Sequence, residues 1–159
     1  MKNWFNSLSF QMKLVVGAAG IAAIYYIIKL VMAQMKKAKL NAAFNSDFDD
    51  LLGAGQKPSL PKNTYMMLAD KIYAAGCYGI FCSGTDEAAM YDAFNQMQND
   101  LDITLLSKAF GFREPRGGFC IPGTNCDISL GEWLPSELNQ EEIGKINKLL
   151  LSKGIKSVF

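Results

Sequence analysis

Histidine is absent from the 159 residues of the chain, and only two of its 16 basic residues are arginines. Without histidine the chain cannot build a Ser/His/Asp or Cys/His catalytic centre, and a zinc ion would have only thiolates and carboxylates as ligands. The two arginines, Arg113 and Arg116, fall far short of a basic nucleic-acid surface. We therefore expect no nucleic-acid partner.

Acidic residues are missing from the first part of the chain, since all 15 lie from Asp47 onward. Residues 1–46 hold six lysines and carry a charge of +6, while residues 47–159 carry −5, so the overall charge of +1 hides two different segments. This asymmetry predicts two parts with different surroundings.

An uninterrupted apolar run follows a flank at residues 1–13. Residues 14–28 are uncharged, Lys29 interrupts, and the apolar residues resume to Ala33. As a helix, residues 14–33 would be about 30 Å long, which matches the hydrocarbon core of a bilayer. We interpret them as a single-pass membrane anchor, with the bilayer as a partner. The residues that typify it are Leu14, Ile21, Tyr25, Tyr26 and Lys29, of which the last three suit the bilayer interface.

Two other interpretations of this run stay open. A buried helix of a soluble protein would need more chain around it than is present, and a cleaved signal sequence would end at Ala33. Lys36, Lys37 and Lys39 follow the run closely, and this favours a C-terminal part that faces the cytoplasm or the interior of an enveloped particle. The small residues between Gly17 and Ala23 predict helix–helix association in the membrane, and hence a homo-oligomer.

Beyond the anchor, the sequence predicts an all-α protein. Leu40, Phe44, Phe48 and Leu51 recur at helical spacing, so residues 34–52 should extend the anchor as a helical stalk that ends at Gly53. Residues 53–63 are rich in glycine, proline and lysine and are typical of a linker. Residues 64–159 are expected to form a small domain of five helices.

The expected helices of this domain start and stop at recognisable signals. They cover 64–75, which stops at Gly76, then 86–97 capped by Thr85, 101–110 capped by Asp100, a short helix after Ser129, and 143–152. Ser129 and Glu132, and again Asn139 and Glu142, have the spacing of a capping box. Residues 155–159 are expected to form a tail.

Several motifs of this domain resemble one annexin repeat. They are Gly84-Thr85-Asp86-Glu87 before a helix, Phe110-Gly111-Phe112-Arg113 after one, and Ser136-Glu137-Leu138. The resemblance covers residues 64–152 and implies a five-helix unit that responds to calcium and phospholipid. Its ligands would be the carbonyl groups of Ile80, Cys82 and Gly84 with the carboxylate of Glu137, a chemistry that suits Ca²⁺. Apart from this alternative, we expect no cofactor.

A second resemblance is to small proteins of Bacteroidetes and of their phages and prophages. The segments that carry it are GTDEAAMYDAF, AFGFR, LGEWLPSEL and INKLLLSKGI. It implies a virion or mobile-element product and, as partners, other membrane or capsid proteins.

The four cysteines form two local pairs in the sequence, Cys77 with Cys82 and Cys120 with Cys126. Three disulfide connectivities are open, including one between the two loops, and buried free thiols or a thiolate zinc site are alternatives. Disulfides would indicate an oxidising compartment, opposite to the side that the lysines favour.

The segment 113–127 is long for a connection within a small helical domain, and we expect it to be a contact loop with Arg113 and Arg116 facing a partner. No set of catalytic residues is recognisable. A lysis enzyme that uses Glu87 alone would lack the second acid that such chemistry usually needs. The sequence thus favours a structural or adaptor protein of a phage virion or bacterial envelope, with the annexin-like module and the lysis enzyme as alternatives.

Overall fold

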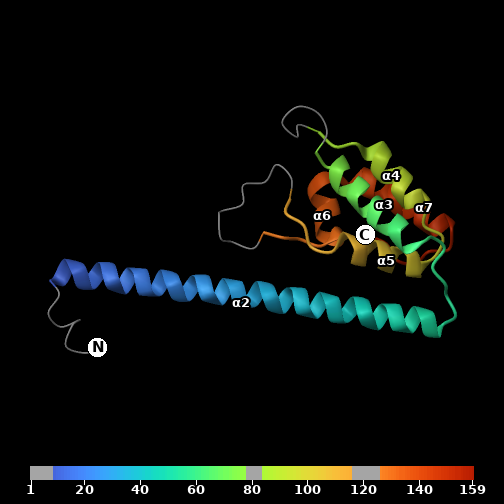
Figure 1. Cartoon of the computed structure of the whole chain (residues 1–159). Helices are drawn as coiled ribbons and strands as arrows, with labels where there is room; N and C mark the ends of the chain where they lie inside the picture. The colour runs from blue at the N-terminus through green and yellow to red at the C-terminus, as the bar shows by residue number, and fades with distance from the viewer. Residues whose placement is uncertain (1–8, 78–83, 116–125) are drawn as a thin grey trace.

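The computed structural model describes residues 9–77, 84–115 and 126–159, and within these ranges the chain is helical (Figure 1). No strand occurs in the described ranges, and an isolated antiparallel bridge joins Arg113 and Ile128. The helices are α2 (Phe10–Gly53), α3 (Lys62–Ala75), α4 (Glu87–Asn95), α5 (Asp100–Phe110), α6 (Leu130–Glu137) and α7 (Gln140–Ser152). The prediction of an all-α chain with one long helix before a five-helix domain is confirmed.

The long helix α2 is continuous through both the predicted anchor and the predicted stalk. Its first turn is capped by Ser9, whose hydroxyl accepts from the Met12 amide at 3.4 Å, and it ends at Gly53 as the sequence predicts. No proline interrupts residues 10–53, so nothing in the sequence breaks the backbone hydrogen bonds.

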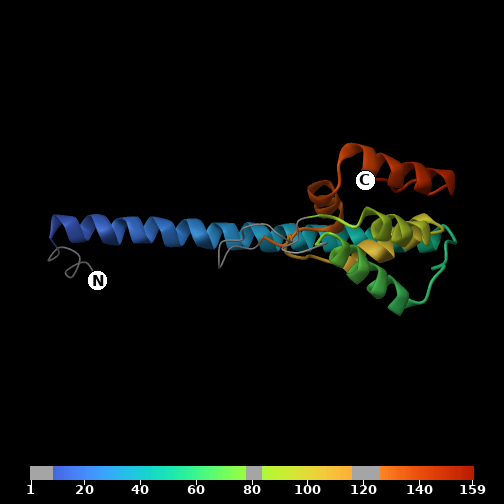
Figure 2. The ribbon, with the colours of Figure 1, turned by 90° about the horizontal axis from the view of Figure 1, so that it is seen from above.

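The domain lies alongside the C-terminal half of α2 and leaves the N-terminal half without a neighbour among the described elements (Figures 1 and 2). The predicted stripe of Leu40, Phe44, Phe48 and Leu51 is the half-buried side of α2, which packs against α5. The stalk is therefore a docking surface for its own domain and does not hold that domain away from the anchor.

The core of the domain is built around Trp133 of α6, which is fully buried. Its ring lies 5.5 Å from the ring of Phe110 and 6.1 Å from that of Tyr73, measured between centroids. Gly76, at the end of α3, touches this ring so closely that an added Cβ would lie 2.2 Å from Trp133 Cζ2. The three helices α3, α5 and α6 thus meet at one aromatic cluster.

Two of the predicted helix caps are wrong by one residue. The N-cap of α4 is Asp86, whose carboxylate accepts from the Ala89 amide at 2.9 Å, while the predicted Thr85 donates its hydroxyl to the carbonyl of Glu137 at 3.2 Å. Asn99 caps α5, because its side chain accepts from the Asp102 amide at 3.0 Å. Both predicted residues are occupied by contacts that are distant in sequence.

Local signals also set the ends of the later helices. Both capping boxes are present, at Ser129 with Glu132 and at Asn139 with Glu142. Gly111 follows α5 with a φ of 61°, and Gly154 follows α7 with a φ of 77°. Both angles lie in the left-handed region, which glycine adopts without strain.

The predicted linker joins α2 to α3 and is fastened to α5 by a buried carboxylate. Asp102 is 0% exposed, and its carboxylate accepts from the Ser59 amide at 2.9 Å, the Ser59 hydroxyl at 2.5 Å, the Gln98 amide at 2.8 Å and the Tyr65 hydroxyl. The Gln56 side chain also accepts from the Leu101 amide, at 3.0 Å. The segment is thus a structural part of the domain.

The C-terminal residues are fastened in a similar way. The Asp100 carboxylate accepts from the amides of Lys156 and Ser157 at 2.8 and 2.7 Å. The Asn147 side chain exchanges two hydrogen bonds with the backbone of Phe159, and the Phe159 ring lies 5.3 Å from that of Phe94. Asp100 therefore holds the tail against the domain and is not free to cap α5.

These carboxylates predict how stability depends on pH. Burial by itself would raise the pKa of Asp102, Asp100 and Glu132, but the hydrogen bonds that each accepts outweigh it and hold each pKa below its ordinary value of 3.8 for the aspartates and 4.5 for the glutamate. A carboxylate with a lowered folded-state pKa stabilises the fold above its unfolded-state pKa, and this contribution is lost as the pH falls through the folded-state value.

We expect the free energy of unfolding to fall steeply once the pH drops below about 4, measured by urea unfolding of the full chain in detergent micelles. Burial raises the pKa of Glu137 above its ordinary value of 4.5. This single group therefore makes the fold slightly more stable as the pH falls from neutral toward 4.5, which is the opposite trend. An unfolding free energy that stays constant down to pH 2 would contradict the carboxylate network.

Candidate functional site

The N-terminal half of α2 is an apolar helix that nothing in the described structure covers. Its most apolar window has a mean hydropathy of 2.1 and is 0% buried, so α2 is long and apolar enough to cross a membrane. Within the described ranges no element of the chain buries this window, as a core helix of the same chain would require. Gly17 and Gly20 belong to the surface predicted to associate with a second helix. A Cβ added at either position would have no neighbouring atom within 4 Å.

The predicted anchor residues all project from this uncovered helix. The exposed fractions are 60% for Leu14, 72% for Ile21, 60% for Tyr25 and 41% for Tyr26. The ammonium of Lys29 lies 5.1 Å from the centroid of the Tyr25 ring, one turn toward the N-terminus. This direction follows from the tilt of every Cα–Cβ bond toward the helix N-terminus.

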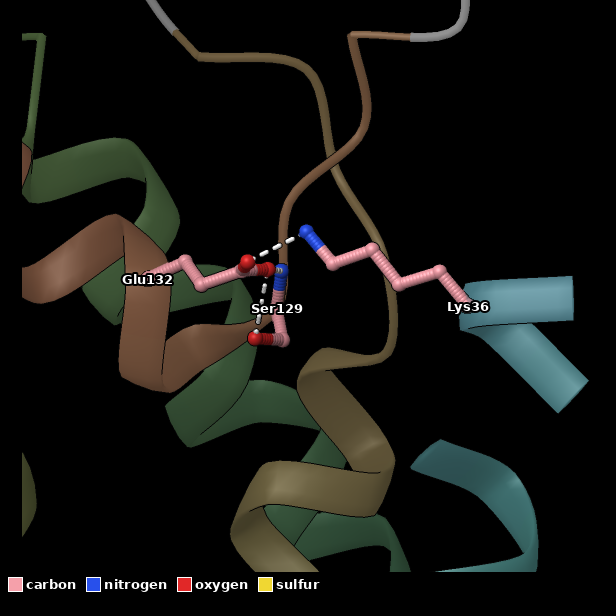
Figure 3. A network of polar contacts seen from close by, with 3 residues as sticks. All are labelled: Lys36, Ser129 and Glu132. Atoms are coloured by element: carbon pink, nitrogen blue, oxygen red, sulfur yellow. Dashed lines mark hydrogen bonds and ion pairs between the residues drawn. The ribbon is translucent and has the colours of Figure 1, made fainter. Parts of the chain in front are cut away.

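Where α2 reaches the domain, three residues from two elements meet in a polar network (Figure 3). The Lys36 ammonium donates to one carboxylate oxygen of Glu132, at the start of α6. The other oxygen accepts from the amide of Ser129 at 3.1 Å and from its hydroxyl at 3.0 Å. The capping box of α6 is thus also the point at which the domain binds the long helix.

The electrostatics of this network favour an ionised Glu132. Burial would raise its pKa, but hydrogen bonds from Lys36 and from Ser129 outweigh that effect and lower the pKa. The negative charge also lies in the first turn of α6, where the helix dipole stabilises it.

Two further contacts run along the same side of α2. Lys37 forms an ion pair with Asp127 at 2.6 Å, and its ammonium lies 5.4 Å from the centroid of the Phe112 ring. Lys108 of α5 donates to the Asn45 side chain at 2.9 Å and lies 5.4 Å from the centroid of the Phe48 ring. We name five residues the α2–α6 junction: Lys36 and Lys37 of α2, Asp127 and the N-cap Ser129 before α6, and Glu132 of α6.

The sequence could not identify the α2–α6 junction as a site. The capping box at Ser129 and Glu132 and the cluster of lysines after the anchor are both visible in the sequence, but Lys36 and Glu132 are separated by 96 residues. Only the tertiary packing of α2 against α5 brings them together.

The residues of the predicted calcium site are only partly described. Ile80 and Cys82 lie outside the described residues, while the Thr85 hydroxyl, next to Gly84, donates to the Glu137 carbonyl at 3.2 Å. The two motifs of the annexin resemblance therefore lie side by side. Calcium prefers six to eight oxygen ligands, and within the described ranges no group of three acidic, cysteine or histidine residues is placed to hold a metal. Because the predicted ligands are mainly backbone carbonyl groups, two of which lie outside the described residues, the calcium site stays a prediction.

Neither described cysteine is a free thiol, since Cys77 and Cys126 are both disulfide-bonded. The other two cysteines, Cys82 and Cys120, lie outside the described residues. The connectivity of the four cysteines therefore stays a prediction.

The contact loop is also only partly described, and its first arginine is engaged within the domain. The Arg113 guanidinium donates to the Phe110 carbonyl at 3.0 Å and to the Asp70 carboxylate at 2.7 Å, and it stacks on the rings of Tyr73 and Phe110. Arg116 lies outside the described residues. The packing of Arg113 is structural, so a partner would have to displace it from Asp70.

Glu87, the candidate for a lysis enzyme, is exposed at the start of α4. It lines an open hollow whose walls mix charged residues, Asp92, Glu142 and Lys145, with apolar ones, Tyr91, Leu138 and Ile146. A general acid is usually activated by burial in an apolar pocket, and Glu87 is exposed.

Comparisons with known proteins give no relative: no family model, no curated protein and no solved structure matches the chain.

Proposed function

We propose that this protein is a single-pass membrane-anchored adaptor, in which α2 crosses the bilayer and carries a five-helix domain close to the membrane surface. The observation that carries the proposal is the division of α2 into two halves. The N-terminal half is apolar and uncovered, while the C-terminal half docks the domain through the half-buried stripe and the α2–α6 junction.

The unbroken helix α2 couples the domain mechanically to the anchor. Because α2 has no break between the apolar half and the docked half, a force on the domain is transmitted directly to the anchor. The domain offers other proteins the exposed surfaces of α4 and α7, and the small residues near Gly17 offer a second copy a surface within the membrane. The partners we propose are membrane or capsid proteins.

The setting we propose is a phage virion membrane or a bacterial envelope. This part of the proposal depends on the resemblance of the sequence motifs to proteins of Bacteroidetes and their phages. The all-helical domain is compatible with that setting and also with the annexin-like alternative. A calcium titration distinguishes the two, because only the annexin-like module should bind calcium.

The test of anchoring is extraction of cell or particle membranes with alkaline carbonate, followed by intact mass measurement. We expect the full 17.5 kDa chain to stay in the membrane pellet. A charge at the centre of the span costs about 3 kcal/mol, so we expect Ile21→Lys to move a large fraction to the supernatant. The control is Met66→Lys, at an equally apolar but domain-borne residue that is 53% exposed.

A shorter mature chain that begins after Ala33 would overturn the proposal, because the helix would then be a signal sequence. Full extraction of the unmodified chain by carbonate would overturn it as well. A rise in melting temperature at millimolar calcium would instead favour the annexin-like module.

A further inference from the structure

A groove lies between α2 and the start of α6, at the end of the proposed membrane span. Its volume is about 740 Å³. The α2 wall is formed by Met32, Met35, Lys36, Lys39, Leu40 and Ala43, and the opposite wall by Ser129, Gly131 and Glu132. The groove therefore combines an apolar surface with two lysines.

The position of the groove matches the depth of lipid headgroups. At 1.5 Å per residue, Lys36 and Lys39 lie about 4.5 and 9 Å beyond Ala33, where the span ends. The headgroup layer occupies about 5–8 Å on each side of the hydrocarbon core. Because the Cα–Cβ bonds of a helix tilt toward its N-terminus, both lysine side chains leave α2 on the side nearer the bilayer.

The charges of the groove favour an anionic group. The Glu132 carboxylate is already engaged by Lys36 and by Ser129, so it does not need a further cation. Lys39 is exposed and has no ion-pair partner within the ranges that the structure describes. One uncompensated positive charge thus remains in the groove.

The apolar wall continues into the span. Met35 lines both this groove and a second hollow with Leu30, Val31, Gln34 and Ala38, about one turn nearer the membrane centre. An acyl chain could therefore follow α2 from the bilayer to the groove along a mostly apolar surface.

From this geometry we infer that the groove between α2 and α6 binds one anionic phospholipid of the surrounding bilayer. Its phosphate contacts Lys39 and Lys36, and its acyl chains run along Met32 and Met35. The inference rests on the proposed membrane anchoring. Such a lipid would bridge α2 and α6, so that an anionic membrane stabilises the docked position of the domain.

The test uses the full chain in nanodiscs that contain equal amounts of phosphatidylcholine and phosphatidylglycerol, with native mass spectrometry of the lipids that remain bound. We expect about fivefold enrichment of phosphatidylglycerol, and near parity for Lys39→Gln. The matched control is Lys148→Gln, which makes the same charge change on α7 and should leave the enrichment unchanged.

Two variants separate a lipid in the groove from general attraction to lysines. Ala43→Trp and Gly131→Leu fill the groove without changing the charge, and Gly131 has no other atoms near an added Cβ. We expect both to abolish the enrichment. If both variants folded and still enriched phosphatidylglycerol, the inference would be wrong. It would also be wrong if the unmodified chain entered the nanodisc but enriched no phosphatidylglycerol, and in both cases the proposed anchoring would be unaffected. Failure of the chain to enter nanodiscs would overturn the anchoring itself.

Discussion

Replacing Asp102 with alanine should lower the free energy of unfolding by about 4 kcal/mol, a large part of the total for a domain of this size. The side chain is 0% exposed and accepts hydrogen bonds from Ser59 of the linker, from Tyr65 of α3 and from the Gln98 amide. Alanine would leave these donors without an acceptor in a buried place. The measurement is urea unfolding of the full chain in micelles, followed by near-ultraviolet circular dichroism.

A graded series guards against a variant that does not fold. Asp102→Asn keeps the side-chain volume but removes the charge, and its NH2 group then faces another hydrogen-bond donor. We expect the free energy of unfolding to fall by about 2 kcal/mol. Tyr65→Phe removes only one donor and should cost about 1 kcal/mol. The same network raises the pKa of the Tyr65 hydroxyl to about 12, through burial and through its hydrogen bond to Asp102.

The control for this series is Asp92→Asn, which removes a carboxylate that forms an exposed ion pair with Lys71. Exposed pairs contribute less than about 1 kcal/mol, so this variant should unfold almost as the unmodified chain does. If Asp102→Ala unfolded like the control, the buried network would not be what fastens the linker.

Gly76→Ala should destabilise the domain by about 3 kcal/mol. An added Cβ would lie 2.2 Å from Cζ2 and 2.7 Å from Cη2 of Trp133, and 3.2 Å from Cδ of Glu137. The Trp133 ring has little room to shift away from the new methyl group, because it is fully buried and packs against Phe110 and Tyr73. Thermal unfolding of the full chain in micelles measures the loss.

The backbone of Gly76 has a φ of −72°, which alanine adopts without strain, so the whole effect should come from the ring. Trp133→Phe in the same chain should therefore recover part of the loss, as a double-mutant cycle would show. Gly144→Ala on α7 is the control, since nothing lies within 4 Å of its added Cβ, and it should stabilise the helix by about 1 kcal/mol. Equal effects of the two glycine variants would contradict the proposed contact.

The residues that sequence reasoning placed best are those governed by neighbours along the chain. The end of α2 at Gly53 and the capping boxes at Ser129 and Asn139 depend on groups within four residues of each other. Helix type and approximate length follow from the same short-range spacing. The two misplaced caps, Thr85 and Asp100, failed because contacts with Glu137 and with the C-terminal residues take up their side chains.

Gly76 shows a second way in which prediction from the sequence is limited. Its place after an apolar helix correctly predicts that α3 ends there, but its negative φ means that the turn does not require glycine. What requires it is the indole ring of Trp133, 57 residues later in the sequence. The sequence contains no local signal of that contact.

By itself, the sequence determined that the chain is all-helical, that an apolar run long enough to cross a bilayer precedes an acidic domain, and that one helix joins the two. Each of these properties follows from composition or from spacing within a few residues. Only the tertiary structure decided that the domain lies against the helix that carries it, that Asp102 fastens the linker, and that Lys36 meets Glu132. These contacts join residues that are 43 to 96 positions apart, and they form because the half-buried stripe of α2 and the surface of α5 remove each other's apolar area from water.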